Sequence, residues 1–409
     1  MPDDQLRAKN IPSLGEPSKA QVSLLRAQEQ LYEEMSDSGL LQYPALTNRA
    51  DLFKERGLSI LLKSLSRLQG TITDSTARAV IPTRSRITKG QPAYRLTKLG
   101  TTVRGCCNLF LNQGSDQPHW INDYADHQFS PVITVMLRAM KRWAADISFW
   151  LAEGELIPTD ERDTAALRAI QRLVAFVRRV SASRKFKFAW HDYTRQADAN
   201  FRSACKYVQH LFAGRTKLLV LRVDLYLRPG QQAWGFTREA DRYAARLQRL
   251  LHDGRIVPRF LGGIYKRENG IHRGMHWHCM FFVDGHRHSN ACFYSQIIGE
   301  TWMKLVGGNR ASYFNCYTRR HEYKFNGLGT VSTKDIKKLI GIRAALHYMT
   351  KRDCVLKATS GKQQNFRRSK LRANQKHAGG APRKDDDSLR EVKRALSGTR
   401  SVYPAWLSP

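Results

Sequence analysis

The stretch that decides the fold is residues 266–282, KRENGIHRGMHWHCMFF. Its second half predicts a β-strand, and side chains alternate between the two faces of a strand, so His276 and His278 point the same way. The Asn-Gly pair before it predicts a turn, which returns the preceding strand to the same neighbourhood and brings Glu268 with it. The stretch therefore predicts a β-hairpin with two imidazoles and one carboxylate close together.

These three side chains are the donor set of an open metal site. Two imidazole nitrogens and one carboxylate oxygen leave coordination positions for a substrate, whereas structural zinc sites are closed by four Cys or His ligands. We therefore predict that Glu268, His276 and His278 bind a divalent cation. Two alternatives remain. The same donor set occurs in non-haem Fe(II) oxygenases, and two buried histidines can simply be satisfied by hydrogen bonds.

A second H-x-H pair, His286 and His288, is predicted to be a decoy. It follows Asp284-Gly285 in a turn and has an arginine between its histidines, so no strand holds both rings on one face. With 13 histidines in the chain, one such pair by chance is unsurprising. A structural zinc domain that adds this pair and Cys292 to the strand histidines is the competing interpretation.

The region around the hairpin predicts an α+β domain. Its apolar runs and helix-type spacings alternate in the order βαββαβα, and a hairpin in the middle of that order favours a largely antiparallel sheet with helices packed on it. The predicted elements are strands at about 217–226, 257–268, 274–284 and 311–318 and helices at about 237–253, 291–306 and 334–353.

Tyr348 and Lys351 share one face of the last predicted helix because they are three residues apart. A phenol is a poor nucleophile near its ordinary pKa of about 10. It becomes useful when a metal ion polarises a phosphate and a cation lies nearby. We predict Tyr348 as a nucleophile and Lys351 as that cation; a half-buried core tyrosine is the alternative.

The charge of the chain points to a polyanionic partner. Its 68 Lys and Arg residues exceed its 35 Asp and Glu residues by 33, which favours nucleic acid over an anionic membrane surface. We find no apolar run long enough for a membrane span and no signal-peptide layout at the N-terminus. Seven cysteines without a C-x-x-C fit a reducing compartment, so we expect a cytoplasmic protein.

The remaining sequence divides by pattern into three further regions. We expect a mixed, partly helical region at 1–129, with a helix near 19–36 followed by loops. A helical region follows at 130–215, with helices at about 130–154, from about 159 and at about 194–213. The α+β domain occupies 216–356, and 357–409 is expected to be a basic, loosely ordered tail.

Taken in order, these motifs resemble those of the HUH-superfamily endonucleases, and among them the inovirus-type rolling-circle replication initiators of filamentous phages. The matching pieces are Leu-Arg-Val-Asp-Leu at 221–225, Lys-Arg-Glu at 266–268, Gly-Met-His-Trp-His at 274–278 and Tyr-Met-Thr-Lys at 348–351. The resemblance covers about a third of the chain and is specific as an ordered set.

The resemblance implies a metal-dependent enzyme that nicks DNA and transfers the strand. His276 and His278 would bind Mg²⁺ or Mn²⁺ with Glu268 as third ligand. Tyr348 would form a 5′-phosphotyrosyl link and release a 3′-OH primer, while Lys351 holds the phosphate. The implied partners in a bacterial host are single-stranded or hairpin origin DNA and, because no P-loop motif occurs, a host helicase and polymerase.

The chain departs from the two-tyrosine initiators, because the predicted helix at 334–353 contains no second tyrosine. Termination would then use a second protomer, hydrolysis or another residue. A relaxase or transposase of the same superfamily is an alternative, and so is a basic DNA-binding regulator without catalysis.

Overall fold

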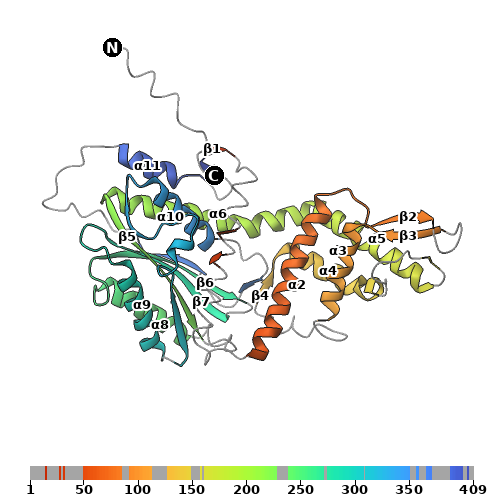
Figure 1. Ribbon diagram of the computed structural model, residues 1–409, viewed down its shortest axis with the longest axis horizontal. Coiled ribbons are helices and arrows are strands. Elements are labelled where there is room, and N and C mark those ends of the chain that lie inside the picture. Colours follow the sequence, from red (N-terminus) through yellow and green to blue (C-terminus); the bar gives the residue numbers. More distant parts are fainter. Residues whose placement is uncertain are drawn as a thin grey trace, which may run out of the picture. The chain divides into compact units, whose positions relative to one another are not determined.

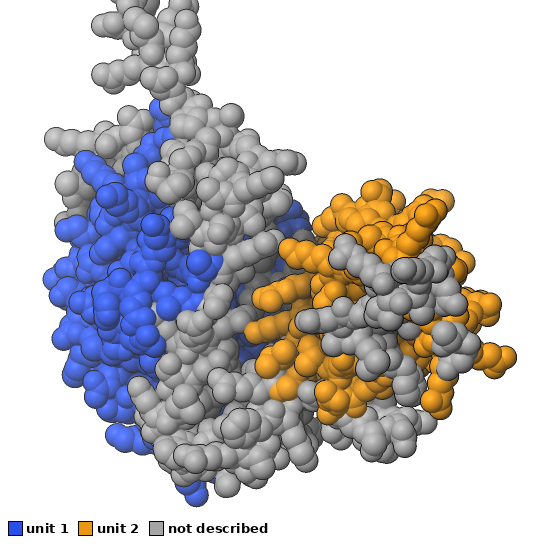
Figure 2. Space-filling model, turned by 45° about the vertical axis from the view of Figure 1, so that its right-hand side comes forward, with its two compact units in different colours: residues 1–48, 196–352, 361–409 blue, residues 49–195, 353–360 orange. Residues whose placement is uncertain are grey.

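The computed structural model divides into two compact units, coloured in Figure 2: unit 1 is 1–48, 196–352 and 361–409, and unit 2 is 49–195 and 353–360. The residues that the structure describes are 14–15, 27–28, 31–32, 49–84, 92–112, 127–148, 157–158, 161–227, 238–270, 274–307, 309–350, 356–358, 365–370, 387–398 and 403–404.

Unit 1 is built on an antiparallel sheet, which confirms the predicted α+β class with antiparallel strands. Along the sheet the strands follow the order β11-β6-β7-β5-β8. Strand β9 pairs with the same edge of β5 as β8 does, but along the first part of β5. The strands are β5 (Lys217–Leu227), β6 (Phe260–Gly270), β7 (Gly274–Asp284), β8 (Ala311–Asn315), β9 (Gly329–Ser332) and β11 (Phe366–Arg368).

Helices cover both faces of this sheet (Figure 1). One face packs on α8 (Arg238–His252) and α9 (Ala291–Val306). The other packs on α6 (Arg184–Ala213), α10 (Ile336–Met349) and α11 (Asp387–Ala395).

The alternation of β5 assigns each residue to one of these faces. Leu219 and Leu221 lie in the core with α8 and α9, whereas Leu218 and Val220 lie in the core with α6 and α10. Even-numbered residues of β5 therefore face α10, since side chains alternate along a strand.

Strand register aligns the motif residues on that α10 face. Glu268 of β6 is paired with His276 of β7, and His278 of β7 is paired with Asp224 of β5. Directly paired residues of antiparallel strands project from the same face of a sheet, so three neighbouring strands bring four polar side chains together.

Helix ends fix where α10 presents its last turn. The side chain of Asp335 accepts a hydrogen bond from the backbone amide of Lys338 at 3.1 Å, which caps the first turn. The helix ends at Met349, and the amide of Thr350 donates to the carbonyl of Leu346 at 3.0 Å. Tyr348 thus lies in the final turn.

Unit 2 is mainly helical. Its helices pack around buried apolar side chains such as Leu61, Met136 and Ile170, and it carries two small strand pairs, β2 with β3 and β4 with β10. Its elements are α2 (Arg49–Thr73), β2 (Val80–Arg84), β3 (Pro92–Leu96), α3 (Lys98–Leu111), β4 (His127–Phe129), α4 (Pro131–Ser148), α5 (Glu161–Ala182), the first part of α6 and β10 (Leu356–Ala358).

One expectation for this part of the chain differs from the structure. We expected loops after residue 36, which is wrong for 49–73, where α2 buries Leu58, Leu61 and Leu65 on one side. Glycines at positions 57 and 70 lower the helix propensity of this segment, and packing overrides them. Within 75–98, residues 80–84 and 92–96 pair as the antiparallel strands β2 and β3.

The helices expected from about 130, 159 and 194 are present as α4, α5 and α6, and α6 begins earlier, at Arg184. Of the expected helix near 19–36, residues 27–28 and 31–32 are described and helical. Two terminal strands, β1 (Leu14–Gly15) and β12 (Tyr403–Pro404), pair with each other. Across the described part of the chain, none of the helices has both the length and the apolarity that crossing a membrane requires.

Candidate metal centre

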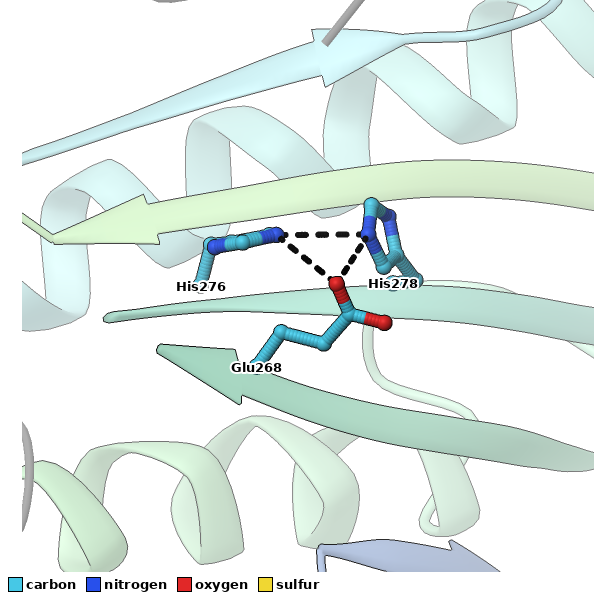
Figure 3. A group of neighbouring side chains, drawn as sticks. All are labelled: Glu268, His276 and His278. Atoms are coloured by element: carbon cyan, nitrogen blue, oxygen red, sulfur yellow. Dashed lines mark hydrogen bonds and ion pairs between the residues drawn. The ribbon is translucent and has the colours of Figure 1, made fainter. Parts of the chain in front are cut away.

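Glu268, His276 and His278 converge on one point at the α10 face of the sheet (Figure 3). The Nε2 atoms of the two histidines are 3.2 Å apart. Glu268 Oε2 lies 3.8 Å from His276 Nε2 and 3.6 Å from His278 Nε2. Among the residues that the structure describes, this is the group of His, Cys, Asp and Glu side chains that could hold a metal ion.

These spacings suit ligands of a single cation. Metal–ligand bonds of about 2.1 Å place neighbouring ligand atoms of one ion about 3.0–3.4 Å apart. The distance between the two histidine nitrogens lies within that range, and the distances from Glu268 to each of them are slightly longer. Two imidazole lone pairs at 3.2 Å repel each other unless a proton or a cation lies between them. A nitrogen–oxygen donor set with open positions fits Mg²⁺, Mn²⁺ or Zn²⁺.

The three donors differ in their access to solvent. The histidine side chains are 1% and 0% exposed, whereas the Glu268 side chain retains 13%. The centre is therefore an enclosed site whose most accessible ligand is the carboxylate. Behind His276, the ring of Tyr226 is stacked at 5.7 Å between centroids, and Trp302 Nε1 donates to the Tyr226 carbonyl at 3.0 Å.

Asp224 fixes the orientation of the His278 ring. Its Oδ1 lies 2.9 Å from His278 Nδ1, an ion-pair distance that favours a proton on the Asp224 side of the ring, and Nε2 faces the other donors. Carboxylates in this position set the tautomer of metal-binding histidines and raise their basicity. From the sequence we assigned no role to Asp224; the signal that could have found it is its strand register with His278.

The charges around His278 and Asp224 favour a positive charge at the centre. Burial opposes protonation of His278, but the carboxylates of Asp224 and Glu268 outweigh it and raise the pKa of His278 above its usual value. Burial also disfavours the Asp224 carboxylate, yet His278 and Arg222 together lower the pKa of Asp224. In the absence of a cation, a proton on His278 neutralises the same carboxylates.

Tyr348 of α10 lies against this centre. Its side chain is fully buried, and its Oη is 3.4 Å from His278 Nε2, the nitrogen that also faces Glu268. The two rings meet edge to face with centroids 5.2 Å apart. The structure therefore brings Tyr348 to the three predicted metal ligands. The fourth predicted neighbour, Lys351, lies outside the described residues.

The second H-x-H pair lies elsewhere. His286 Nε2 is 3.0 Å from Thr216 Oγ1, and His288 Nδ1 is 2.8 Å from Tyr294 Oη, both beyond the end of β7. The structure does not group these rings with His276 and His278. The structural zinc interpretation thus gains no support, and the difference between the pairs is that a strand holds only the first on one face.

No protein-family model, curated protein or solved structure matches this chain. The functional interpretation therefore depends on the chemistry of the site and on the ordered motifs.

Proposed function

We propose that this protein is a metal-dependent DNA-nicking and strand-transfer enzyme of the HUH type, and that it initiates rolling-circle replication. The observation that supports this most is the position of the Tyr348 phenol oxygen, 3.4 Å from a nitrogen of the His-His-Glu group. A phenol within hydrogen-bond range of a donor set for a divalent cation is an arrangement suited to attack on a phosphodiester.

In this mechanism the residues of the chain have separate tasks. Glu268, His276 and His278 would hold Mg²⁺ or Mn²⁺, and the bound ion would supply positive charge to polarise the scissile phosphate. Tyr348 Oη forms a bond to phosphorus while the bond from phosphorus to the 3′-oxygen breaks. The phenol proton leaves to solvent and the 3′-oxygen takes up a proton, so charge balances and a 3′-OH primer remains. Lys351 neutralises the bound phosphate.

The partner in this proposal is single-stranded or hairpin origin DNA in a bacterial cytoplasm. A net charge of +33 supplies affinity for phosphates regardless of sequence. Strand separation and synthesis are left to a host helicase and polymerase. A relaxase or transposase would use the same chemistry on other DNA, whereas a non-catalytic regulator would use none of it.

A covalent-adduct assay tests the proposal. The protein is mixed with single-stranded DNA from its own genetic neighbourhood, with Mn²⁺ or with chelator, and run on a denaturing gel beside Tyr348→Phe. Tyr294→Phe is a matched control, because Tyr294 lies on α9 at the opposite face of the sheet and bonds to His288. We expect a metal-dependent protein–DNA band from the wild type and the control but not from Tyr348→Phe.

Other outcomes separate the alternatives. A band that survives Tyr348→Phe would keep the nicking reaction and reject Tyr348 as nucleophile. Tight binding without a band for any fragment would overturn the proposal in favour of the regulator.

A further inference from the structure

Arg222 is a buried cation beside the candidate centre. It lies on β5 two residues before Asp224, on the same face, and is 1% exposed. Its Nε is 3.8 Å from Asp224 Oδ1. Its Cζ lies 4.0 Å from the ring centroid of Tyr32 and 5.0 Å from that of Tyr348.

This environment leaves part of the guanidinium without hydrogen bonds. Arg222 Nε and Nη1 form no hydrogen bond with any described residue, and the groups that face the guanidinium include one carboxylate and the rings of Tyr32 and Tyr348. Buried ion pairs contribute little to stability compared with apolar residues of similar volume. The presence of a guanidinium here therefore needs an explanation other than stability.

Tyr32 forms the other side of the Arg222 site and is itself held in place. Gln28 Nε2 donates to Tyr32 Oη at 2.8 Å and to the carbonyl of Phe325 at 2.9 Å, while the amide of Phe325 donates to Gln28 Oε1 at 2.8 Å. The ring of Tyr32 lies 4.9 Å from the ring of Tyr348 and is 3% exposed. A segment from the beginning of the chain thus packs against the predicted nucleophile.

The contacts form a closed ring of four side chains. Arg222 faces Asp224 and Tyr348, and His278 faces the same two residues from the other side, at 2.9 Å and 3.4 Å. A change at Arg222 therefore acts on the carboxylate that orients His278 and on the ring that carries the phenol. A change at Tyr32 acts on the phenol ring and the guanidinium but does not touch Asp224.

We propose that Arg222, backed by Tyr32, is a positioning residue that aligns the Tyr348 ring and the Asp224 carboxylate together, so that one guanidinium sets both the nucleophile and the metal centre. The part that concerns Tyr348 rests on the proposed nicking function. The part that concerns Asp224 requires only that the centre binds a cation, and it can be tested without DNA.

The test compares Arg222→Lys and Arg222→Met with two Tyr32 variants. Mn²⁺ affinity is measured without DNA by the electron paramagnetic resonance of free Mn²⁺, and adduct formation is measured as a single-turnover rate. We expect both Arg222 variants to lose Mn²⁺ affinity by up to about tenfold, because Arg222 acts through Asp224, the outer-shell partner of His278. We also expect them to form adduct more slowly.

The Tyr32 variants separate the two effects. Tyr32→Leu removes the ring that packs on Tyr348, so we expect it to slow the adduct by about a hundredfold, as small misplacements of reacting groups do. Its Mn²⁺ affinity should fall less than in the Arg222 variants, because Tyr32 packs on the Arg222 guanidinium and acts on Asp224 only through it. Tyr32→Phe keeps the ring and should slow the adduct far less.

Arg343→Lys is the matched control for losing a buried guanidinium. Arg343 is also 1% exposed, but it lies on α10 over the ring of Phe201 at 4.9 Å and donates to carbonyls near the end of α11, at Ala395 and Ser397. Its replacement should lower the melting temperature and leave Mn²⁺ affinity unchanged. A purely structural role of Arg222 would give the same result as this control.

The outcomes decide the inference. Folded Arg222→Lys with wild-type Mn²⁺ affinity would overturn it; if Arg222→Met fails to fold, the lysine variant, which retains a positive charge, decides alone. If the wild type forms no adduct with any DNA, the nicking proposal fails, and Mn²⁺ affinity by itself decides whether Arg222 positions Asp224. An equal loss of Mn²⁺ affinity in Arg343→Lys would also overturn the inference.

Discussion

The two faces of the unit 1 sheet bury different kinds of side chain, although β7 contributes to both. Towards α8 and α9 the strand presents Trp277 and Phe281 to an apolar core. Towards α10 it presents His276 and His278, next to the buried carboxylate of Asp224. One residue of register separates the two sets, because the side-chain period of a strand is two.

The difference shows how one strand can serve stability and chemistry at once. Burial of apolar area on the α8 and α9 face contributes favourably to folding. Burial of charged groups on the α10 face is costly unless each is paired. We therefore expect substitutions on the α10 face to change mainly metal binding, and substitutions on the α8 and α9 face to change mainly stability.

The largest effect is expected from removing both imidazoles. His276→Ala with His278→Ala should abolish Mn²⁺ binding and DNA cleavage, while much of the salt-sensitive DNA affinity remains, because phosphate contacts are spread over many cations. His286→Ala with His288→Ala is the matched control and should keep all three properties. Metal titration and fluorescence anisotropy at several salt concentrations measure them. DNA binding lost as completely as cleavage would mean that the strand histidines are structural.

On the opposite face, Trp302→Ala should act on stability. The indole of Trp302 is fully buried, contacts Trp277 at 5.3 Å between centroids and donates to the backbone of β5. Its removal should lower the free energy of unfolding by about 3–5 kcal/mol, measured by urea denaturation. Below the unfolding transition, Mn²⁺ affinity should change little; a loss as large as in the histidine variants would contradict the division between the faces.

An intermediate effect is expected for Asp224→Asn, which keeps the shape but removes the charge that orients His278. Mn²⁺ affinity should fall by about 10–100-fold, as for other outer-shell carboxylates. Asp241→Asn serves as the control, because this carboxylate pairs with Arg267 on the α8 side. Isothermal titration with Mn²⁺ compares the two variants, and equal affinities would remove Asp224 from the metal centre.

The smallest effect is a pH dependence of Mn²⁺ binding. Asp224 and Glu268 raise the pKa of His278 above 6.5 in spite of its burial, so a proton competes with the cation at pH 6.5 and somewhat higher. Mn²⁺ affinity should therefore rise with pH until the raised pKa is passed. The same proton stabilises the metal-free fold below 6.5, and that stability is lost as pH rises through the raised value.

Metal titrations across this pH range measure the change in Mn²⁺ affinity, and thermal unfolding measures the change in stability of the metal-free protein. In Asp224→Asn the rise in affinity should move to lower pH, because one of the two carboxylates responsible is gone. An affinity that does not change with pH would mean that His278 is not a ligand.

Much of this centre was predictable because it is local. The hairpin and the common face of His276 and His278 follow from strand alternation, and Glu268 returns beside them as predicted. The turn predicted at Asn269-Gly270 is wrong, because both residues are paired strand residues of β6, opposite Met275 and Gly274. The predicted α+β class is confirmed for the same reason, since it depends on the order of short elements. The identity of the cation, the partner and the reaction remain predictions.

The parts that were missed depend on distant segments. Asp224 faces His278 only through the register of two strands far apart in the sequence, and Tyr32 reaches Tyr348 across most of the chain. The pairing of β11 with β6 involves a short polar segment that carries no clear pattern. Such contacts are decided by tertiary packing rather than by local pattern. The packing of α11 had a local signal that the expectation of a loosely ordered tail overlooked, because Leu389, Val392 and Leu396 recur at helical spacing.

The hydrogen bonds of Gln28 have a consequence for how the protein is made. They join residues 297 positions apart, and Tyr32 and Tyr348 are separated even further. At synthesis rates of about 5–20 residues per second, the ribosome needs on the order of 15–60 s between these two tyrosines. A nascent chain therefore carries no assembled centre until nearly all of unit 2 and the sheet have been translated.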